Sequence, residues 1–122
     1  MSTLEEGRQL GGKLSMVGEY YGISTEVVYS DMNQPLGRSA GLWNEVVEAM
    51  DTLKGEGPDD VKEIVLKLGA SLLVQSAVAE TEDKGRRIQT ALIESGHAFE
   101  RFLKMVSAHG GDVSFLQNPR LS

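Results

Sequence analysis

The side chains that could do chemistry are few in this sequence, and the histidines come first. Its 122 residues include two histidines, His97 and His109, and no cysteine. Cysteine-ligated metals, disulfides and thiolate catalysis are therefore excluded. Two histidines would form a zinc site only with the help of carboxylates, and our expectation for both is a satisfied or solvated side chain.

Two other patterns suggest phosphate or nucleic-acid binding, and their context argues against both. The pair Gly11-Gly12 lies inside a helical pattern, whereas phosphate loops lie between a strand and a helix. Basic clusters at residues 84–87 and 101–104 stand among acids, and the net charge is −6. Nucleic-acid partners need a basic face, so we predict solvated helix faces and no nucleic-acid partner.

Carboxylates supply the remaining candidates. Asp31 lies in the stretch SDMNQPLGRS, residues 30–39, which is rich in turn-forming residues, so its simplest role is to cap a turn. Glu48 lies in the helical pattern that follows, where an exposed surface carboxylate is the ordinary expectation. From residue types alone we predict no catalytic and no cofactor-binding residue.

The elements that position these residues begin with a helix and an apparent strand. Thr3 and Glu6 have the spacing of a capping box, which predicts a helix from Leu4 to about Gly22. Residues 24–30 are rich in β-formers and predict one β-strand. A solitary strand leaves both edges without hydrogen-bond partners, which indicates that the chain is incomplete or pairs with a second copy.

Apolar side chains at helical spacing fill the rest of the chain. Trp43 belongs to the first of these helices and is predicted to lie in the core, while Pro58, Asp59 and Asp60 open the next helix at its positive end. We predict a mainly α fold of four to five amphipathic helices with one strand, in a single domain over residues 1–122. The predicted breaks lie at residues 55–57, 78–84, 95–96 and 110–111.

The composition is that of a globular protein, with 40% hydrophobic and 25% charged residues. No apolar run approaches the roughly 18 residues of a membrane span, and the first six residues lack the pattern of a secretory signal. We therefore expect a cytoplasmic protein without a membrane partner.

Several stretches resemble, in the same order, the pyrimidine-nucleoside phosphorylases, which include thymidine phosphorylase. The strongest is SDMNQPLG at residues 30–37, and the resemblance extends over about residues 3–119. These enzymes are several times longer, so the matched part resembles an internal segment of their central α/β domain. The other matching stretches are residues 45–58, 66–69, 94–96 and 105–112.

The resemblance implies a fragment or truncated homologue of a pentosyltransferase, a glycosyltransferase of pyrimidine metabolism. Such enzymes cleave thymidine or uridine with phosphate to give the free base and pentose 1-phosphate. In the family a Lys-His-Ser-Thr-Gly-Gly loop holds phosphate, and an Arg, Ser and Lys hold the base. These motifs do not occur in the 122 residues, so we expect the chain alone to be inactive and not to bind phosphate, the family co-substrate.

The resemblance also implies half of a monovalent-cation site, usually for potassium. The family ligands correspond to the backbone carbonyls of Leu36 and Ser39 and to the carboxylate of Glu48. Carbonyl and carboxylate oxygens suit a hard cation. The sequence departs from the family close to this site, since residues 42–44 are Leu-Trp-Asn where the family reads Asn-Ala-Leu.

Alternatives for partners remain open. A complementary phosphorylase chain would complete the enzyme. Alternatively, the chain is a stand-alone helical interaction module that forms a homodimer through the strand edges near residues 26–30, or that binds a partner protein. A small acidic regulator of a full-length phosphorylase is a third hypothesis.

Overall fold

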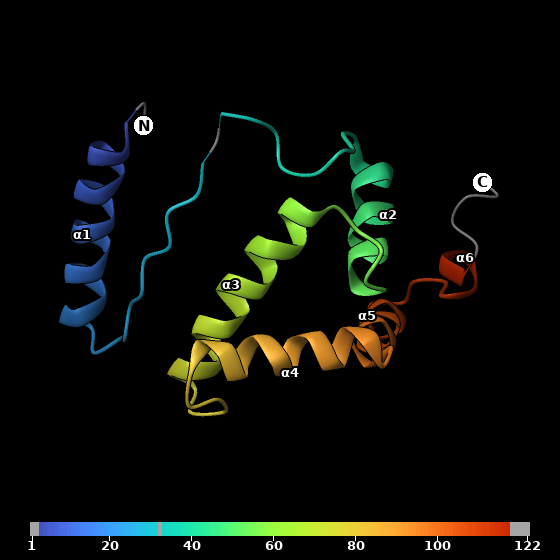
Figure 1. The fold of residues 1–122 in the computed structure, drawn as a ribbon. Coiled ribbons are helices and arrows are strands. Elements are labelled where there is room, and N and C mark those ends of the chain that lie inside the picture. Colours follow the sequence, from blue (N-terminus) through green and yellow to red (C-terminus); the bar gives the residue numbers. More distant parts are fainter. Residues whose placement is uncertain (1–2, 32, 118–122) are drawn as a thin grey trace.

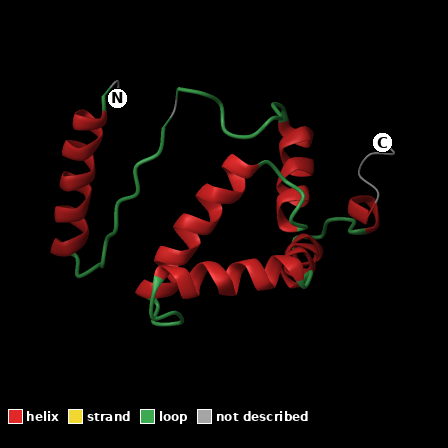
Figure 2. Cartoon of the chain, in the orientation of Figure 1, coloured by secondary structure: helices red, strands yellow, loops and turns green. Residues whose placement is uncertain are grey.

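A computed structural model of the chain describes residues 3–31 and 33–117. Within these residues the secondary structure is helical, without a β-strand (Figure 2). The prediction of a mainly α fold is confirmed, and none of the described helices is long and apolar enough to cross a membrane. The helices are α1 (Leu4–Tyr20), α2 (Leu42–Leu53), α3 (Asp59–Gln75), α4 (Glu82–Glu94), α5 (His97–Ala108) and α6 (Ser114–Gln117).

Most helix ends lie where the local sequence places them. The hydroxyl of Thr3 accepts the N–H of Glu6 at 3.2 Å, and the Glu6 carboxylate accepts the N–H of Thr3 at 3.2 Å, which is the predicted capping box. Gly96 separates α4 from α5 with a φ of +81°, in the left-handed region that favours glycine. The predicted break at residues 95–96 is therefore confirmed, whereas the four-residue α6 was not predicted.

The closest helix packing joins α3 and α4. A Cβ atom added to Gly85 would lie 3.1 Å from the Cα of Ala70, so the absence of a side chain lets the two helices approach. The side-chain amide of Gln89 donates to the carbonyl of Leu66 at 3.0 Å and so joins the same helices. The buried apolar side chains of the described residues are Met50, Leu66, Ala70, Ala79, Ile93 and Leu116.

This core is small for the length of the chain. Trp43, which we expected in the core, is 36% exposed and packs against Phe115 with ring centroids 5.4 Å apart. Apolar side chains on α1 and α3 are also exposed, for instance Leu14 and Leu72. Burial of apolar surface is the main favourable contribution to folding, so much of this contribution is not realised within the described chain.

The prediction of a β-strand at residues 24–30 is wrong. Residues 24–31, called here the extended segment, lie between α1 and α3 (Figure 1). Their side chains alternate, since Val27 contacts α1 at Gly11 while Glu26 accepts a hydrogen bond from Ser71 of α3. Within the described residues the segment makes no backbone–backbone hydrogen bond. It has the side-chain period of a strand, but no second strand among residues 3–31 and 33–117 supplies the ladder.

Candidate functional site

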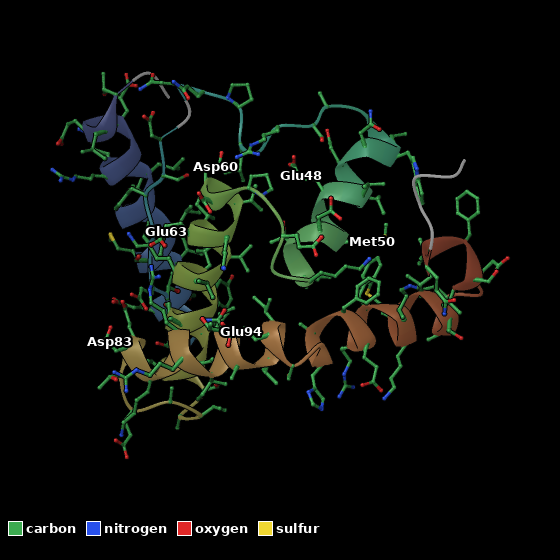
Figure 3. The ribbon with its side chains drawn as sticks, turned by 45° about the vertical axis from the view of Figure 1, so that its right-hand side comes forward. Glu48, Met50, Asp60, Glu63, Asp83 and Glu94 are labelled. Carbon is green, nitrogen blue, oxygen red and sulfur yellow. The ribbon has the colours of Figure 1, made fainter. Side chains whose placement is uncertain are left out.

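The candidate site is the loop of residues 36–41, which two carboxylates from different helices hold in place. The Oε2 atom of Glu48 on α2 accepts the N–H of Arg38 at 2.8 Å. The Oδ2 atom of Asp60, in the first turn of α3, accepts the N–H of Gly37 at 2.9 Å. Both carboxylates lie close to this loop in Figure 3. Successive backbone amides are thereby fixed by α2 and α3.

Glycine is required at position 37 for two separate reasons. The φ of Gly37 is +77°, where residues with a Cβ are strained. A Cβ atom added there would also overlap the Oε1 atom of Glu48 and lie 3.2 Å from a methyl group of Val61. The Glu48 carboxylate therefore packs directly on the backbone of the loop, and the absence of a side chain at position 37 permits this contact.

The electrostatics of the loop favour the ionised form of Asp60. The N–H of Gly37 lowers the pKa of Asp60 below the ordinary value of 3.8, and the nearby Arg38 charge lowers it further. The N–H of Val61 donates to the other oxygen of Asp60 at 2.9 Å, which also lowers its pKa. At the start of α2, Glu45 accepts the N–H of Gly41 at 3.3 Å. Acids thus surround one face of the loop.

The three residues predicted to hold a cation lie on and beside this loop. Glu48 contacts the backbone at Gly37 and Arg38, which lie between Leu36 and Ser39 in the chain. The donors have the right chemistry for a hard cation, although Oε2 of Glu48 already accepts an amide. Among the described residues no group of three or more His, Asp or Glu side chains gathers to hold a metal, so a cation here would depend on backbone carbonyls.

The other candidate residues have structural roles. Asp31 accepts the N–H of Asn33 at 2.9 Å, which confirms the predicted turn cap. His97 begins α5, where its Nδ1 atom lies 2.7 Å from the hydroxyl of Ser95, and His109 caps the other end of α5. Both histidines are exposed, in agreement with the expectation of solvated side chains.

The role of Asp60 was not predicted. The sequence marks it as an acid at a helix start, next to Pro58, and that is where α3 begins. Its hydrogen bond to Gly37 joins residues 23 positions apart. The acid pair after Pro58 is a signal for the helix but carries no information on a partner so distant in the chain.

Comparison with known proteins gives relatives for nearly the whole chain. No protein-family model matches it. It is 41% identical over 119 residues to the pyrimidine-nucleoside phosphorylase of Staphylococcus aureus strain bovine RF122 / ET3-1. The enzymes of the same name from strains USA300 and COL are also 41% identical over 119 residues.

The match is extensive in this chain and partial in the relatives. It covers 98% of the chain, whereas the chain spans about 28% of the length of these relatives. That proportion is consistent with an internal segment of such an enzyme. The resemblance predicted from residues 30–37 and the later stretches is thus confirmed, and the chain is related by sequence, over nearly its whole length, to one segment of the pyrimidine-nucleoside phosphorylases.

Proposed function

We propose that this chain is one segment of a pyrimidine-nucleoside phosphorylase that is inactive until further polypeptide joins it. The reaction is the phosphorolysis of thymidine or uridine to the free base and pentose 1-phosphate. The observation that carries the proposal is the 41% identity over 98% of the chain, confined to about 28% of the relatives. The polypeptide that completes the enzyme belongs either to the same protein or to a complementary phosphorylase chain.

The physical argument for inactivity concerns phosphate. Phosphorolysis needs a cradle that orients phosphate and charges that stabilise the developing transition state. Several basic side chains of the described chain are already paired with carboxylates. Arg86 pairs with Glu63 across α3 and α4, and Lys104 pairs with Glu100 at 3.0 Å within α5. These two cations support helix packing and a helix surface, and we expect the phosphate cradle to come from other polypeptide.

A chimera tests this proposal. This chain would replace the matching segment of the Staphylococcus aureus enzyme, and phosphate-dependent release of thymine or uracil would be measured for the chimera, the isolated chain and the unmodified enzyme. We expect activity in the chimera and none in the isolated chain. An inactive chimera that is folded and binds phosphate normally would contradict the proposal, and so would phosphorolysis by the isolated chain.

We also propose that the carbonyls of Leu36 and Ser39 and the carboxylate of Glu48 contribute half of a potassium site in the complete enzyme. The support is the hydrogen bond between Glu48 of α2 and Arg38, in the loop that carries both carbonyls. Replacing Glu48 by Gln in the chimera removes the charge and keeps the shape. If the site exists, exchanging sodium for potassium should raise the melting temperature of the chimera, and this rise should disappear in Glu48→Gln. The control variant Glu94→Gln on α4 should keep the rise. An unchanged potassium effect in Glu48→Gln would disprove the site.

The second candidate function is a helical interaction module that forms a homodimer. It is supported by large side chains that the described chain leaves mostly exposed: Tyr20 is 84% exposed, Tyr21 72% and Leu42 92%. Light scattering distinguishes the candidates. A monomer at high micromolar concentration would exclude the homodimer, while a stable dimer without activity in the chimera would favour it.

For either function we propose a cytoplasmic location, which microscopy of the tagged protein would test.

A further inference from the structure

Both oxygens of the Asp60 carboxylate accept backbone N–H groups. Its Oδ2 atom accepts the N–H of Gly37 at 2.9 Å, and its Oδ1 atom accepts the N–H of Val61 at 2.9 Å. These two hydrogen bonds hold the carboxylate in one orientation. Asp60 therefore links the first turn of α3 to the loop of residues 36–41.

α3 is a fixed support for this link, because it takes part in the closest helix packing of the described chain. Gly85 lets α4 approach Ala70 of α3, and the side-chain amide of Gln89 donates to the carbonyl of Leu66 at 3.0 Å. A shift of α3 against α4 would disturb both contacts. The loop is thus anchored on the pair of α3 and α4 as well as on α2.

The N–H of Gly37 belongs to the same peptide group as the carbonyl of Leu36. No peptide bond of the described residues is cis, and in a planar trans peptide group the N–H and C=O bonds point in opposite directions. By accepting the N–H of Gly37, Asp60 determines the direction of the Leu36 carbonyl, which points away from the carboxylate. This carbonyl is one of the ligands that we propose for potassium.

The same hydrogen bond also affects the charge on the Leu36 oxygen. An N–H that donates to a carboxylate makes a charge-assisted hydrogen bond, which polarises its peptide group and leaves more negative charge on the carbonyl oxygen. Hard cations bind to such oxygens. The Leu36 carbonyl is therefore a stronger cation ligand than the carbonyl of a peptide group whose N–H faces water.

Glu48 acts on the next peptide group. Its Oε2 atom accepts the N–H of Arg38 at 2.8 Å, and this N–H shares its peptide group with the carbonyl of Gly37, which is not a proposed ligand. The hydrogen bond of Glu48 therefore does not orient the Leu36 carbonyl. Among the described residues, the side chain that binds the peptide group between Leu36 and Gly37 is that of Asp60.

We propose that Asp60 is a positioning residue of the potassium half-site, which orients and polarises the Leu36 carbonyl without touching the cation. This inference rests on the potassium site of the proposed function. Residues that hold a metal ligand in place commonly contribute about 10–100-fold to metal affinity. Loss of the hydrogen-bond acceptor at position 60 should weaken potassium binding, whereas loss of a charge elsewhere in the first turn of α3 should not.

Titration of the chimera with potassium tests this role. The melting temperature would be measured at constant ionic strength while potassium replaces sodium, and the midpoint of the rise gives the apparent potassium affinity. In Asp60→Ala the midpoint should move to about tenfold higher potassium or more. Asp60→Asn keeps an acceptor oxygen for the N–H of Gly37, so most of the affinity should be rescued.

Asp59 provides the matched control. It precedes Asp60 in the first turn of α3 and carries the same charge, but among the described residues it accepts none of the loop N–H groups that Asp60, Glu48 and Glu45 accept. Asp59→Ala should therefore leave the potassium midpoint unchanged. Equal shifts in Asp59→Ala and Asp60→Ala would show that charge acts and not orientation, and would overturn the proposal. Equal shifts in Asp60→Asn and Asp60→Ala would overturn it too.

A measurement on the isolated chain follows the orientation without potassium. The residual dipolar coupling of the Gly37 N–H in the ¹⁵N-labelled chain reports the direction of this bond. We expect the coupling to change in Asp60→Ala and to be kept in Asp60→Asn and Asp59→Ala. An unchanged coupling in Asp60→Ala would overturn the positioning role and leave the potassium site standing.

The unmodified chimera separates failure of this inference from failure of the proposed function. A chimera that retains Asp60 and shows no potassium effect would contradict the potassium site, and this role with it. A potassium effect that persists unchanged in Asp60→Ala would overturn the positioning role alone. A potassium effect in an inactive chimera that is lost in Asp60→Ala would support the role of Asp60 and count only against phosphorolysis.

Discussion

Single backbone amides determine the shape of the candidate site. Gly37 and Arg38 donate to Asp60 and Glu48, and the position of the Glu48 carboxylate depends on Gly37, which leaves room for it. The types of these residues and their helical settings were predictable from the sequence. Their pairing was not, because a hydrogen bond between residues 23 positions apart leaves no local pattern.

Replacing Gly37 by Ala should lower the free energy of unfolding by about 1–3 kcal/mol, through backbone strain and overlap with Glu48. Gly22→Ala is the matched control, because Gly22 also has a positive φ, +71°, but an added Cβ there meets nothing within 4 Å. Urea denaturation measures both. A loss no larger in Gly37→Ala than in Gly22→Ala would show that the Glu48 contact is unimportant.

Asp60 predicts a dependence of stability on pH. Its pKa in the folded chain lies below 3.8 because it accepts the N–H of Gly37. A depressed folded pKa stabilises the fold above the unfolded pKa, and this contribution is lost as the pH falls through the folded value. Unfolding of wild type and Asp60→Asn at pH 6 and pH 3 should therefore show a smaller acid-induced loss in the variant. Equal losses would exclude Asp60 as a contributor.

At the scale of elements, the helices were predictable, whereas the strand predicted at residues 24–30 is not formed in the described chain. Capping boxes, glycine stops and apolar spacing are local, so α1 and the break between α4 and α5 follow from a few neighbouring residues. A β-ladder depends on a second strand, and the described chain does not contain one. α6 was missed because four residues are too few to establish a helical period.

The packing of α3 on α4 depends on Gly85. A leucine at this position would push against the backbone of Ala70 and should lower the free energy of unfolding by about 1–3 kcal/mol, with m-values unchanged. Gly12→Leu on α1 is a suitable comparison, since an added Cβ at Gly12 meets nothing within 4 Å. If denaturant midpoints of the two variants coincide, the close approach of the helices contributes little to stability.

At the scale of the whole molecule, stability should be uneven. In α1 only Gly11 is buried, and the helix stands apart from α2 to α5, with the extended segment between (Figure 1). α3 and α4 share buried side chains, an ion pair and the Gln89 hydrogen bond. The chain therefore consists of a better-packed helical part and a less covered N-terminal part.

Hydrogen exchange should resolve these two parts. Amides of α1 are expected to exchange faster than those of α3 and α4, because local opening of α1 exposes little buried surface. Uniform protection from α1 to α5 in the free chain would contradict this difference.

The corner where Glu48 and Asp60 accept neighbouring amides has a consequence for ionic strength. The charge of Arg38 attracts the Asp60 carboxylate, while the N–H groups of Gly37 and Arg38 hold the two carboxylates by hydrogen bonds. Dissolved salt screens an attraction between exposed charges within a Debye length of about 8–10 Å, while the hydrogen bonds to the backbone change little. Salt should therefore weaken the attraction between Arg38 and Asp60, as it weakens the exposed ion pairs elsewhere on the surface, and leave the geometry of this corner intact.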